Sequence, residues 1–405
     1  MRTICCYLLL LLLPTLAVFA GPAVPLVAAK SGAIATPAAV APTESTSQDH
    51  QAIRQTLLQY LQGTAYNQQS LISRAFHPEA DLLLAKADQP LWKVPLSEYL
   101  SWFKPAKAGQ FNGRIGEILS IEIDGDIATA KAEILLPQKQ QRFVDVFLLK
   151  RINQQWQIIS KAATQQESTQ SGQRILFILS SAHFHGSSSL PAGASFSEIV
   201  NAYAEFKQAG FTVDFISPAG GAVPLAYIDT SDPAQKAHLY SQDFMQALKH
   251  TRTAGELNAA DYRAVHYIGG SSAMYGVAED PHIARLVMDI YQQHQGIISA
   301  VCHGTAGIVH LKTADGQYLV KGKRVSGYPD AFEKQGAAYY QQFPFKIQQT
   351  IEARGGLFRH GKADAAYVEV DGRLITGTNF QSSAGVAKAI IKLLQQNPNA
   401  ASPAG

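Results

Sequence analysis

The stretch Gly296-Ile297-Ile298-Ser299-Ala300-Val301-Cys302-His303-Gly304 decides the fold of the second half of this 405-residue chain. Its apolar run has the length of a buried strand and stops at Cys302, after which residues 304–307 open a helix. A strand–turn–helix elbow of this kind lifts a nucleophile into a cleft. We therefore expect Cys302 to be catalytic. The alternative is a buried, inert cysteine beside a core histidine, because free cysteine is often buried.

The first twenty residues have the features of a secretory signal, with a positive start, an apolar run at Leu8–Leu13 and a small-residue cleavage site at 18–20. An uncleaved anchor is the alternative, although the apolar run is short for a membrane span. Cleavage would remove Cys5 and Cys6 and leave Cys302 without a disulfide partner. The sequence predicts a periplasmic or secreted protein that has no membrane contact once the signal is removed.

The charge balance points to small-molecule partners. Removing Arg2 with the signal leaves 33 basic and 31 acidic residues, and no basic cluster stands out. This composition favours neither nucleic acid nor a membrane surface as a partner.

Composition and periodicity divide the remaining chain. Residues 21–48 are rich in Ala, Pro, Ser and Thr with almost no charge, which is typical of a disordered linker, and the tail 397–405 is similar. We expect one domain at 49–166 and a second at 173–396.

The first domain is predicted to be α+β. Asp49 is placed to cap a helix with apolar positions at a period near 3.6, and residues 124–126 form an Asp-Gly hairpin turn between two apolar runs. Helices followed by an antiparallel sheet give this class. The expected helix positions are Ile53, Leu57, Leu58 and Leu61, and the expected strands are 118–123, 127–136, 142–150 and 155–162.

This order, with Phe76-His77-Pro78 and Trp156, resembles the cone-shaped fold of SnoaL-like, ketosteroid isomerase and nuclear transport factor proteins, and more narrowly the lumazine-binding group. Some relatives carry a carboxylate base inside the cone. Asp81 and Asp145 could face inward here, but no convergent set is evident. The resemblance implies a binding or dimerisation domain, and we expect a homodimer.

The second domain alternates apolar strands with helices, which predicts a parallel sheet covered on both faces. Right-handed crossovers make it a doubly wound, flavodoxin-like sheet with its site at the carboxyl ends of the strands. The expected strands are 175–179, 211–216, 264–268 and 297–301, with helices ending at Gly210 and spanning 242–249 and 281–294.

Residues at the ends of two strands carry the predicted chemistry. His303 follows Cys302 directly and can act as acid or base, while the helix that opens there favours the thiolate. Gly269-Gly270-Ser271 ends the preceding strand, where backbone N–H groups can hold an oxyanion.

The run 300–304, with Gly269-Gly270 before it, resembles the PfpI-type superfamily, which includes the Parkinsonism-associated deglycase and shares the class I glutamine-amidotransferase-like fold. The resemblance covers about residues 174–394. It implies that Glu198 hydrogen-bonds the thiol. The segment 323–333 resembles the one that supplies the triad acid in the glyoxalase III branch, which implies Glu333, with Asp330 as the less favoured choice.

Three departures from the family pattern leave the substrate open. The family's Gly-Gly-His-Gly is Gly269-Gly270-Ser271-Ser272 here, Thr305 replaces a proline, and the segment 216–261 aligns with no motif. His183 and His185 are expected to line the cleft, and no third ligand is evident, so neither a metal nor a cofactor is predicted.

The leading hypothesis is an exported, glutathione-independent glyoxalase that converts 2-oxoaldehydes such as methylglyoxal to 2-hydroxy acids. The first alternative is a thiol hydrolase acting as an amidase, deglycase or peptidase. Glutaminase activity fits less well, because those enzymes use a more distant histidine. Two further alternatives are a stress-related holdase or small-molecule-binding protein, and an oxidant sensor using the Cys302 thiol.

Overall fold

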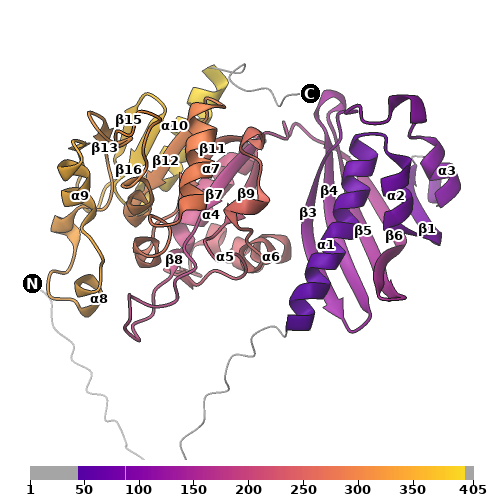
Figure 1. The fold of residues 1–405 in the computed structure, drawn as a ribbon, viewed down its shortest axis with the longest axis horizontal. Helices are drawn as coiled ribbons and strands as arrows, with labels where there is room; N and C mark the ends of the chain where they lie inside the picture. Colours follow the sequence, from indigo (N-terminus) through magenta and orange to yellow (C-terminus); the bar gives the residue numbers. More distant parts are fainter. Residues whose placement is uncertain (1–43, 87, 397–405) are drawn as a thin grey trace, which may run out of the picture. The chain divides into compact units, whose positions relative to one another are not determined.

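The computed structural model describes residues 44–86 and 88–396 (Figure 1). The predicted signal, the tail and residues 21–43 of the predicted linker lie outside the described residues. None of the helices in the described part combines the length and apolar character that a membrane crossing needs.

The first helix begins earlier than the sequence predicted. Helix α1 spans Glu44–Ala65, so residues 44–48 are helical rather than part of a disordered linker. Asp49 therefore lies within the helix and caps nothing. Its carboxylate instead accepts hydrogen bonds from Trp156 Nε1 at 2.9 Å and from Arg151 Nη1 at 3.0 Å, which ties the helix to the last strands of the sheet.

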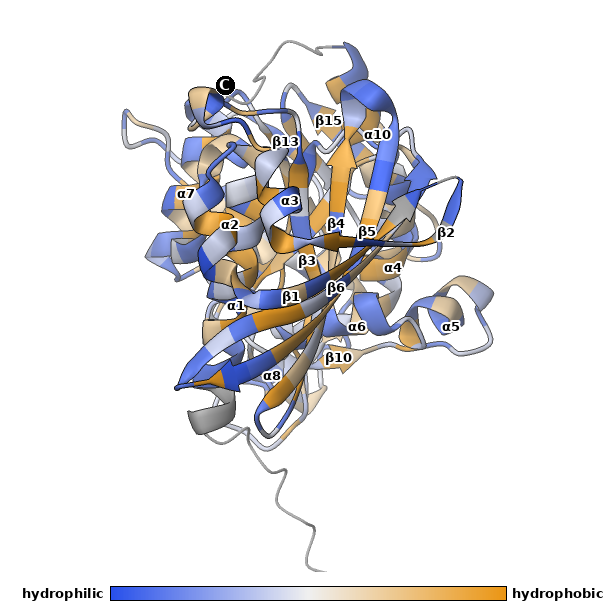
Figure 2. Cartoon of the chain, turned by 90° about the vertical axis from the view of Figure 1, so that its right-hand side faces the viewer, coloured by the Kyte–Doolittle hydropathy of each residue, from blue (hydrophilic) through white to orange (hydrophobic). Residues whose placement is uncertain are grey.

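The first domain is a twisted six-stranded sheet in the order β2-β1-β6-β5-β4-β3. All neighbouring strands are antiparallel except β1 and β6, which run parallel. Hydrophobic and hydrophilic residues alternate along these strands (Figure 2), and one face packs on α1 through Ile53, Leu57 and Tyr60. The elements are α2 (Gln69–Ala75), β1 (Phe76–Lys86), β2 (Gln89–Pro95), α3 (Leu96–Ser101), β3 (Ile115–Asp124), β4 (Ile127–Leu136), β5 (Gln141–Ile152) and β6 (Gln155–Glu167).

The second domain is a six-stranded sheet in the order β15-β16-β12-β11-β7-β9. Five strands are parallel, and β15 at the edge is antiparallel to β16, a departure from the predicted all-parallel sheet. Its strands are β7 (Arg174–Ile178), β9 (Thr212–Ile216), β11 (Tyr262–Tyr267), β12 (Ile297–Val301), β15 (Val368–Asp371) and β16 (Leu374–Gly377).

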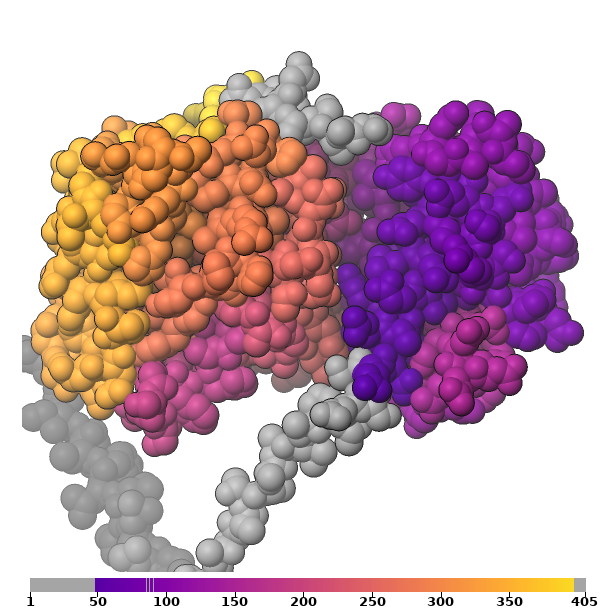
Figure 3. Space-filling model, viewed as in Figure 1, coloured from indigo at the N-terminus to yellow at the C-terminus, as the bar shows by residue number. Residues whose placement is uncertain are grey.

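Helices cover both faces of this sheet, as its apolar strands predict. Ile175 and Phe177 pack with α4 and α10, whereas the alternate Leu176 and Ile178 pack with α7 on the other face. The outward side of α7 forms part of the surface in the view of Figure 3. The remaining elements are β8 (Ala194–Ser195), α4 (Phe196–Gln208), β10 (Leu225–Ala226), α5 (Pro233–Leu239), α6 (Gln242–Lys249), α7 (Pro281–Gln292), β13 (Arg324–Val325), α8 (Ala338–Gln341), α9 (Ile347–Ala353), β14 (Leu357–Phe358) and α10 (Ser383–Gln396).

Candidate active site

Cys302 lies directly after β12, at the carboxyl end of the central strands. Its φ of +56° falls in the left-handed region, which is strained for a residue with a side chain and persists only where the surroundings fix it. The helix that the sequence predicted after the elbow is a 3-10 helix spanning Cys302–Ile308. The side chain is buried, and the residue keeps 7% of its surface exposed.

Glu198 reaches the cysteine from the first turn of α4. It is 1% exposed, and its Oε2 accepts a hydrogen bond from the Gly269 N–H at 2.8 Å. Burial raises the pKa of Glu198 to about 7, against the opposing effects of its hydrogen bonds with Gly269, Cys302 and Ser195. A carboxyl group that holds its proton near neutral pH can exchange that proton with a neighbouring thiol.

Two glycines make this approach possible. A Cβ at Gly269 would lie 2.7 Å from Glu198 Oε2 and 2.9 Å from Cys302 Cβ. Gly270 has φ of +89°, and a Cβ there would lie 2.5 Å from the Gly193 carbonyl oxygen and the Ser195 nitrogen. Any side chain would therefore push the strand end away from the sulfur.

The thiol is not stabilised as an anion in the way the sequence predicted. Burial and then the Glu198 carboxyl raise the pKa of Cys302, while the backbone N–H groups of His303 and Gly270 act in the opposite direction. The short 3-10 turn supplies little helix dipole, so desolvation dominates. A thiolate at Cys302 therefore forms most readily when the proton lies on the Glu198 carboxyl group.

His303 connects the sulfur to a second carboxyl group. Its Nδ1 lies 3.4 Å from Cys302 Sγ, and its Nε2 lies 2.7 Å from Glu333 Oε1. The other oxygen, Glu333 Oε2, accepts from the Tyr339 hydroxyl at 3.0 Å. Because a carboxylate can only accept, Nε2 carries the ring proton and Nδ1 is left free to take one from the sulfur side. Tyr328 stacks on the imidazole with ring centroids 4.6 Å apart.

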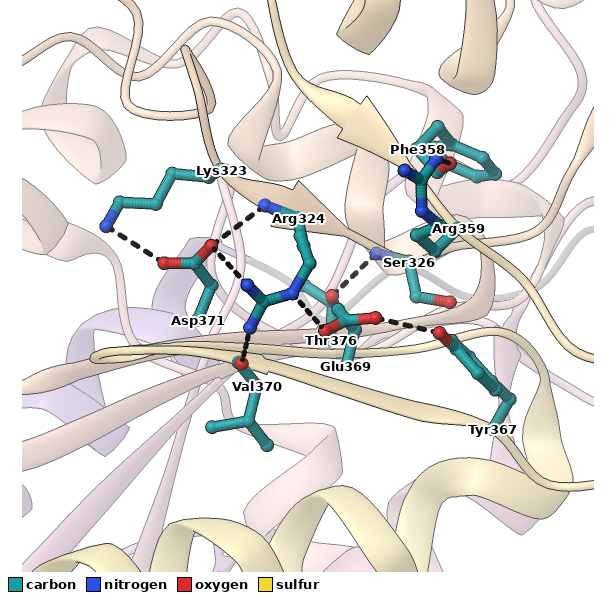
Figure 4. A network of polar contacts seen from close by, with 10 residues as sticks. All are labelled: Lys323, Arg324, Ser326, Phe358, Arg359, Tyr367, Glu369, Val370, Asp371 and Thr376. Atoms are coloured by element: carbon teal, nitrogen blue, oxygen red, sulfur yellow. Dashed lines mark hydrogen bonds and ion pairs between the residues drawn. The ribbon is translucent and has the colours of Figure 1, made fainter.

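The loop that carries Glu333 is anchored upstream by polar contacts of Arg324 and Ser326 with strands β15 and β16 (Figure 4). The Arg324 guanidinium donates to Glu369 Oε1 at 2.7 Å and to the Val370 carbonyl oxygen at 2.8 Å. The Ser326 N–H donates to Thr376 Oγ1 at 2.7 Å. These bonds fix the chain a few residues before the acid, which holds His303 in one orientation.

The structure does not bring Asp330 to His303. This residue is half-buried and lies beside Gln349 and Lys346, and burial raises its pKa. Ser271 is buried at the start of a short 3-10 turn, and the neighbouring Ser272 Oγ is buried without a hydrogen-bond partner. Both serines thus pack near the strand end where the family motif has histidine and glycine.

The two histidines after β7 diverge. His183 is exposed, whereas His185 is buried with its Nδ1 3.3 Å from the Tyr275 hydroxyl and its ring 5.5 Å from that of Tyr339. His185 therefore lies behind the Glu333 carboxylate rather than in the cleft. Among the described residues, no group of three or more His, Cys, Asp or Glu side chains is placed to hold a metal ion.

A pocket of about 500 Å³ opens over Cys302 and His303. The sequence assigned no role to two aromatic residues that line it, because Tyr227 lies in the segment that aligned with no motif and Phe380 lies outside any motif. Tyr328 lies in the segment 323–333, but the sequence assigned it no role. The pocket is lined by Ser195, Ser197, Glu198, Tyr227, Ile228, Asp229, Gln235, Gly270, Cys302, His303, Tyr328 and Phe380.

Asp145 faces inward in the first domain, as the sequence allowed, and it belongs to a buried polar set whose other members the sequence did not reveal. Asp145 Oδ2 accepts from Lys161 Nζ at 2.9 Å and from the Tyr60 hydroxyl at 2.5 Å, and the Tyr99 hydroxyl lies 3.2 Å from that of Tyr60. Asp81 does not face inward, because it pairs with Lys93 at the exposed side of the strand. The signal was hidden because the partners lie on separate elements far apart in the sequence.

These features define a class of protein. It contains a doubly wound α/β domain with a buried cysteine at a strand–turn elbow, a histidine directly after the cysteine and a glutamate from helix α4. The chain belongs to the DJ-1/PfpI family, whose profile matches residues 190–393. A second profile, described as "Putative lumazine-binding", matches residues 48–162. Both resemblances predicted from the sequence are confirmed.

Two glyoxalases and a solved structure are similar to the second domain. The chain is 26% identical over 228 residues to glutathione-independent glyoxalase hsp3101 of Schizosaccharomyces pombe, covering 50% of this chain and 88% of that protein. It is 26% identical over 214 residues to glutathione-independent glyoxalase HSP31 of Saccharomyces cerevisiae, covering 49% and 87%. The crystal structure of the Rapid Encystment Protein of Francisella tularensis is similar at 25% identity and a TM-score of 0.52, covering 55% of this chain and 99% of that one.

Proposed function

We propose that this protein is a glutathione-independent glyoxalase that converts 2-oxoaldehydes to 2-hydroxy acids. The observation that carries the proposal is the chain of contacts from Glu198 through Cys302 and His303 to Glu333. The similarity to two named glyoxalases supports the same activity.

The reaction begins with addition of the Cys302 sulfur to the aldehyde carbon. His303 Nδ1 takes the thiol proton and passes it to the former aldehyde oxygen, which gives a hemithioacetal. The backbone N–H groups at Gly270 and His303 point at the sulfur and are placed to stabilise negative charge on the oxygen beside it.

A proton transfer between adjacent carbons follows. His303 Nδ1 removes the hydrogen of the sulfur-bearing carbon, and the resulting enediol is reprotonated at the former ketone carbon. The hydroxyl proton of the first carbon passes to the second oxygen, so a thioester of the 2-hydroxy acid is formed. Water hydrolyses this thioester and releases the Cys302 thiol. One carbon is oxidised while its neighbour is reduced, so the balance needs no external oxidant.

Lactate formation from methylglyoxal tests the proposal. We expect the wild-type protein to form lactate and Cys302→Ala to form none, with circular dichroism showing that the variant is folded. Equal rates for the two proteins would exclude this activity. Suppression of protein aggregation that survives Cys302→Ala would favour a holdase instead, and cleavage of amides by the wild type alone would favour a thiol hydrolase.

Export and dimerisation belong to the same proposal. The signal-like first twenty residues support a periplasmic or secreted location. N-terminal sequencing of the protein from cell fractions tests export, and size-exclusion chromatography with light scattering tests the homodimer.

A further inference from the structure

The pocket over Cys302 is larger than methylglyoxal requires. Its volume of about 500 Å³ lies within the range of roughly 300–1,000 Å³ that holds drug-sized ligands. The pocket volume exceeds many times over the roughly 30 Å³ that one water molecule takes up in the liquid. A substrate whose only substituent is a methyl group would leave most of this space unfilled.

Large apolar side chains gather at the mouth of the pocket. Tyr227 is 61% exposed, Phe380 50% and Ile228 42%, although all three line the same pocket. Apolar side chains exposed together around a concave site mark a surface that an apolar ligand covers. Tyr328, stacked on His303, continues this aromatic wall down to the reacting atoms.

The backbone at Tyr227 is held in a costly conformation. Its φ is +56°, which is unfavourable for a bulky residue. Strand β10 ends directly before Tyr227 and pairs with β8. Two residues after Tyr227, the Asp229 N–H donates to Gln235 Oε1 at 3.0 Å. Strain of this kind persists where neighbours fix it, and it collects at ligand sites.

The charges around the pocket select against anions. Every residue that lines it is described by the structure, and none of them is lysine or arginine. Two carboxyl groups, Glu198 and Asp229, lie there instead. A phosphate or carboxylate group on the substrate would be desolvated with no cationic partner.

We infer that the physiological substrates are uncharged 2-oxoaldehydes with a bulky aryl or branched alkyl substituent, which Tyr227, Ile228 and Phe380 hold. The inference rests on the proposed function and names its substrate class. The balance of the reaction is unchanged, because the substituent takes no part in bond making. It contributes binding energy that orients the aldehyde carbon toward Cys302.

Three oxoaldehydes test this assignment: phenylglyoxal, its 4-carboxy derivative and methylglyoxal. We expect kcat/KM for phenylglyoxal to exceed those for the other two by about tenfold or more. Tyr227→Asn removes the ring at a position where asparagine tolerates the positive φ, and Phe380→Ala removes the second ring. Each variant should lower kcat/KM for phenylglyoxal about tenfold more than it lowers kcat/KM for methylglyoxal.

Tyr240→Asn is the matched control, because Tyr240 is 76% exposed, follows α5 and does not line the pocket. It should leave both values unchanged. Equal kcat/KM values for phenylglyoxal and methylglyoxal, or an unchanged ratio in both pocket variants, would overturn the inference.

Protection of Cys302 from iodoacetamide separates failure of this inference from failure of the proposed function. Acetophenone has the aryl ketone without the aldehyde, so it has no aldehyde carbon for Cys302 to attack. We expect acetophenone to slow alkylation of Cys302 in the wild type and not in Tyr227→Asn. Benzoate, which is an anion, should slow alkylation in neither protein. Protection without turnover of any oxoaldehyde would refute the glyoxalase activity alone. Turnover of oxoaldehydes with no protection of Cys302 by acetophenone and no preference for phenylglyoxal would refute the substrate class alone.

Discussion

Replacing Glu198 with glutamine should remove a pH dependence of stability. The pKa of this buried carboxyl group is raised from 4.5 to about 7, chiefly by desolvation. Because the folded-state value lies above the unfolded one, the folded protein keeps a proton between pH 4.5 and 7 that the unfolded chain has lost. Stability therefore falls as the pH rises through this window.

The gap of about 2.5 pH units corresponds to about 3 kcal/mol at 1.36 kcal/mol per unit. Glu198→Gln keeps an oxygen that can accept from the Gly269 N–H and has no charge to lose. We expect the free energy of unfolding of the second domain to fall by about 3 kcal/mol more in the wild type than in the variant between pH 4.5 and 8.

Urea unfolding followed by two probes measures this difference. The three tryptophans, Trp92, Trp102 and Trp156, all lie in the first domain, so their fluorescence reports that domain, and far-UV circular dichroism reports both. Glu205→Gln on the same helix is the control, because this residue pairs with Lys388 at the surface and is expected to keep the wild-type dependence. Parallel pH profiles for the wild type and Glu198→Gln would refute the reasoning.

Three further substitutions test other parts of the structure. Glu333→Gln should lower kcat for lactate formation about 10²- to 10⁴-fold in steady-state assays, because His303 loses the acceptor that orients it; a smaller loss would show that the carboxylate does not set the ring. Gly270→Ala should lower the free energy of unfolding by about 2 kcal/mol or more in urea, since a Cβ meets backbone atoms at 2.5 Å and φ is positive. Lys161→Met should destabilise the first domain by about 3 kcal/mol by tryptophan fluorescence, because it removes the ion-pair partner of the buried Asp145 and leaves Arg114 as the nearby cation. Restored stability in the double variant with Asp145→Asn would support that cause.

The sequence predicted the central sheet well because parallel strands buried on both faces are continuous apolar runs. Strand β12 occurs at the predicted residues, and helix α6 does as well. The hairpin of β1 and β2 was not predicted. Both strands contain proline, at Pro78 in β1 and at Pro90 and Pro95 in β2, and their charged residues break the alternation.

Local patterns found the thiol but not its surroundings. Cys302 and His303 are adjacent in the chain, and so a motif exposes them, whereas Glu333 follows them by 30 residues and was reached only through the family resemblance. Tyr227 has no motif at all. Its relevance comes from a backbone angle and from three-dimensional closeness to Phe380, and neither leaves a periodic signal in sequence.

The two glutamates of the site differ because their surroundings differ. Glu198 is fully buried, and desolvation outweighs its hydrogen bonds with Gly269, Cys302 and Ser195, so its raised pKa keeps a proton next to the sulfur. Glu333 accepts from two side chains, His303 and Tyr339, which suits a carboxylate that orients an imidazole. In the proposed mechanism, the neutral Glu198 carboxyl group therefore accompanies the sulfur, and the Glu333 carboxylate orients the imidazole that moves the protons of the thiol and the substrate. The surroundings of Glu198 and Glu333 therefore set their roles, and a substitution of either glutamate alone would not exchange those roles.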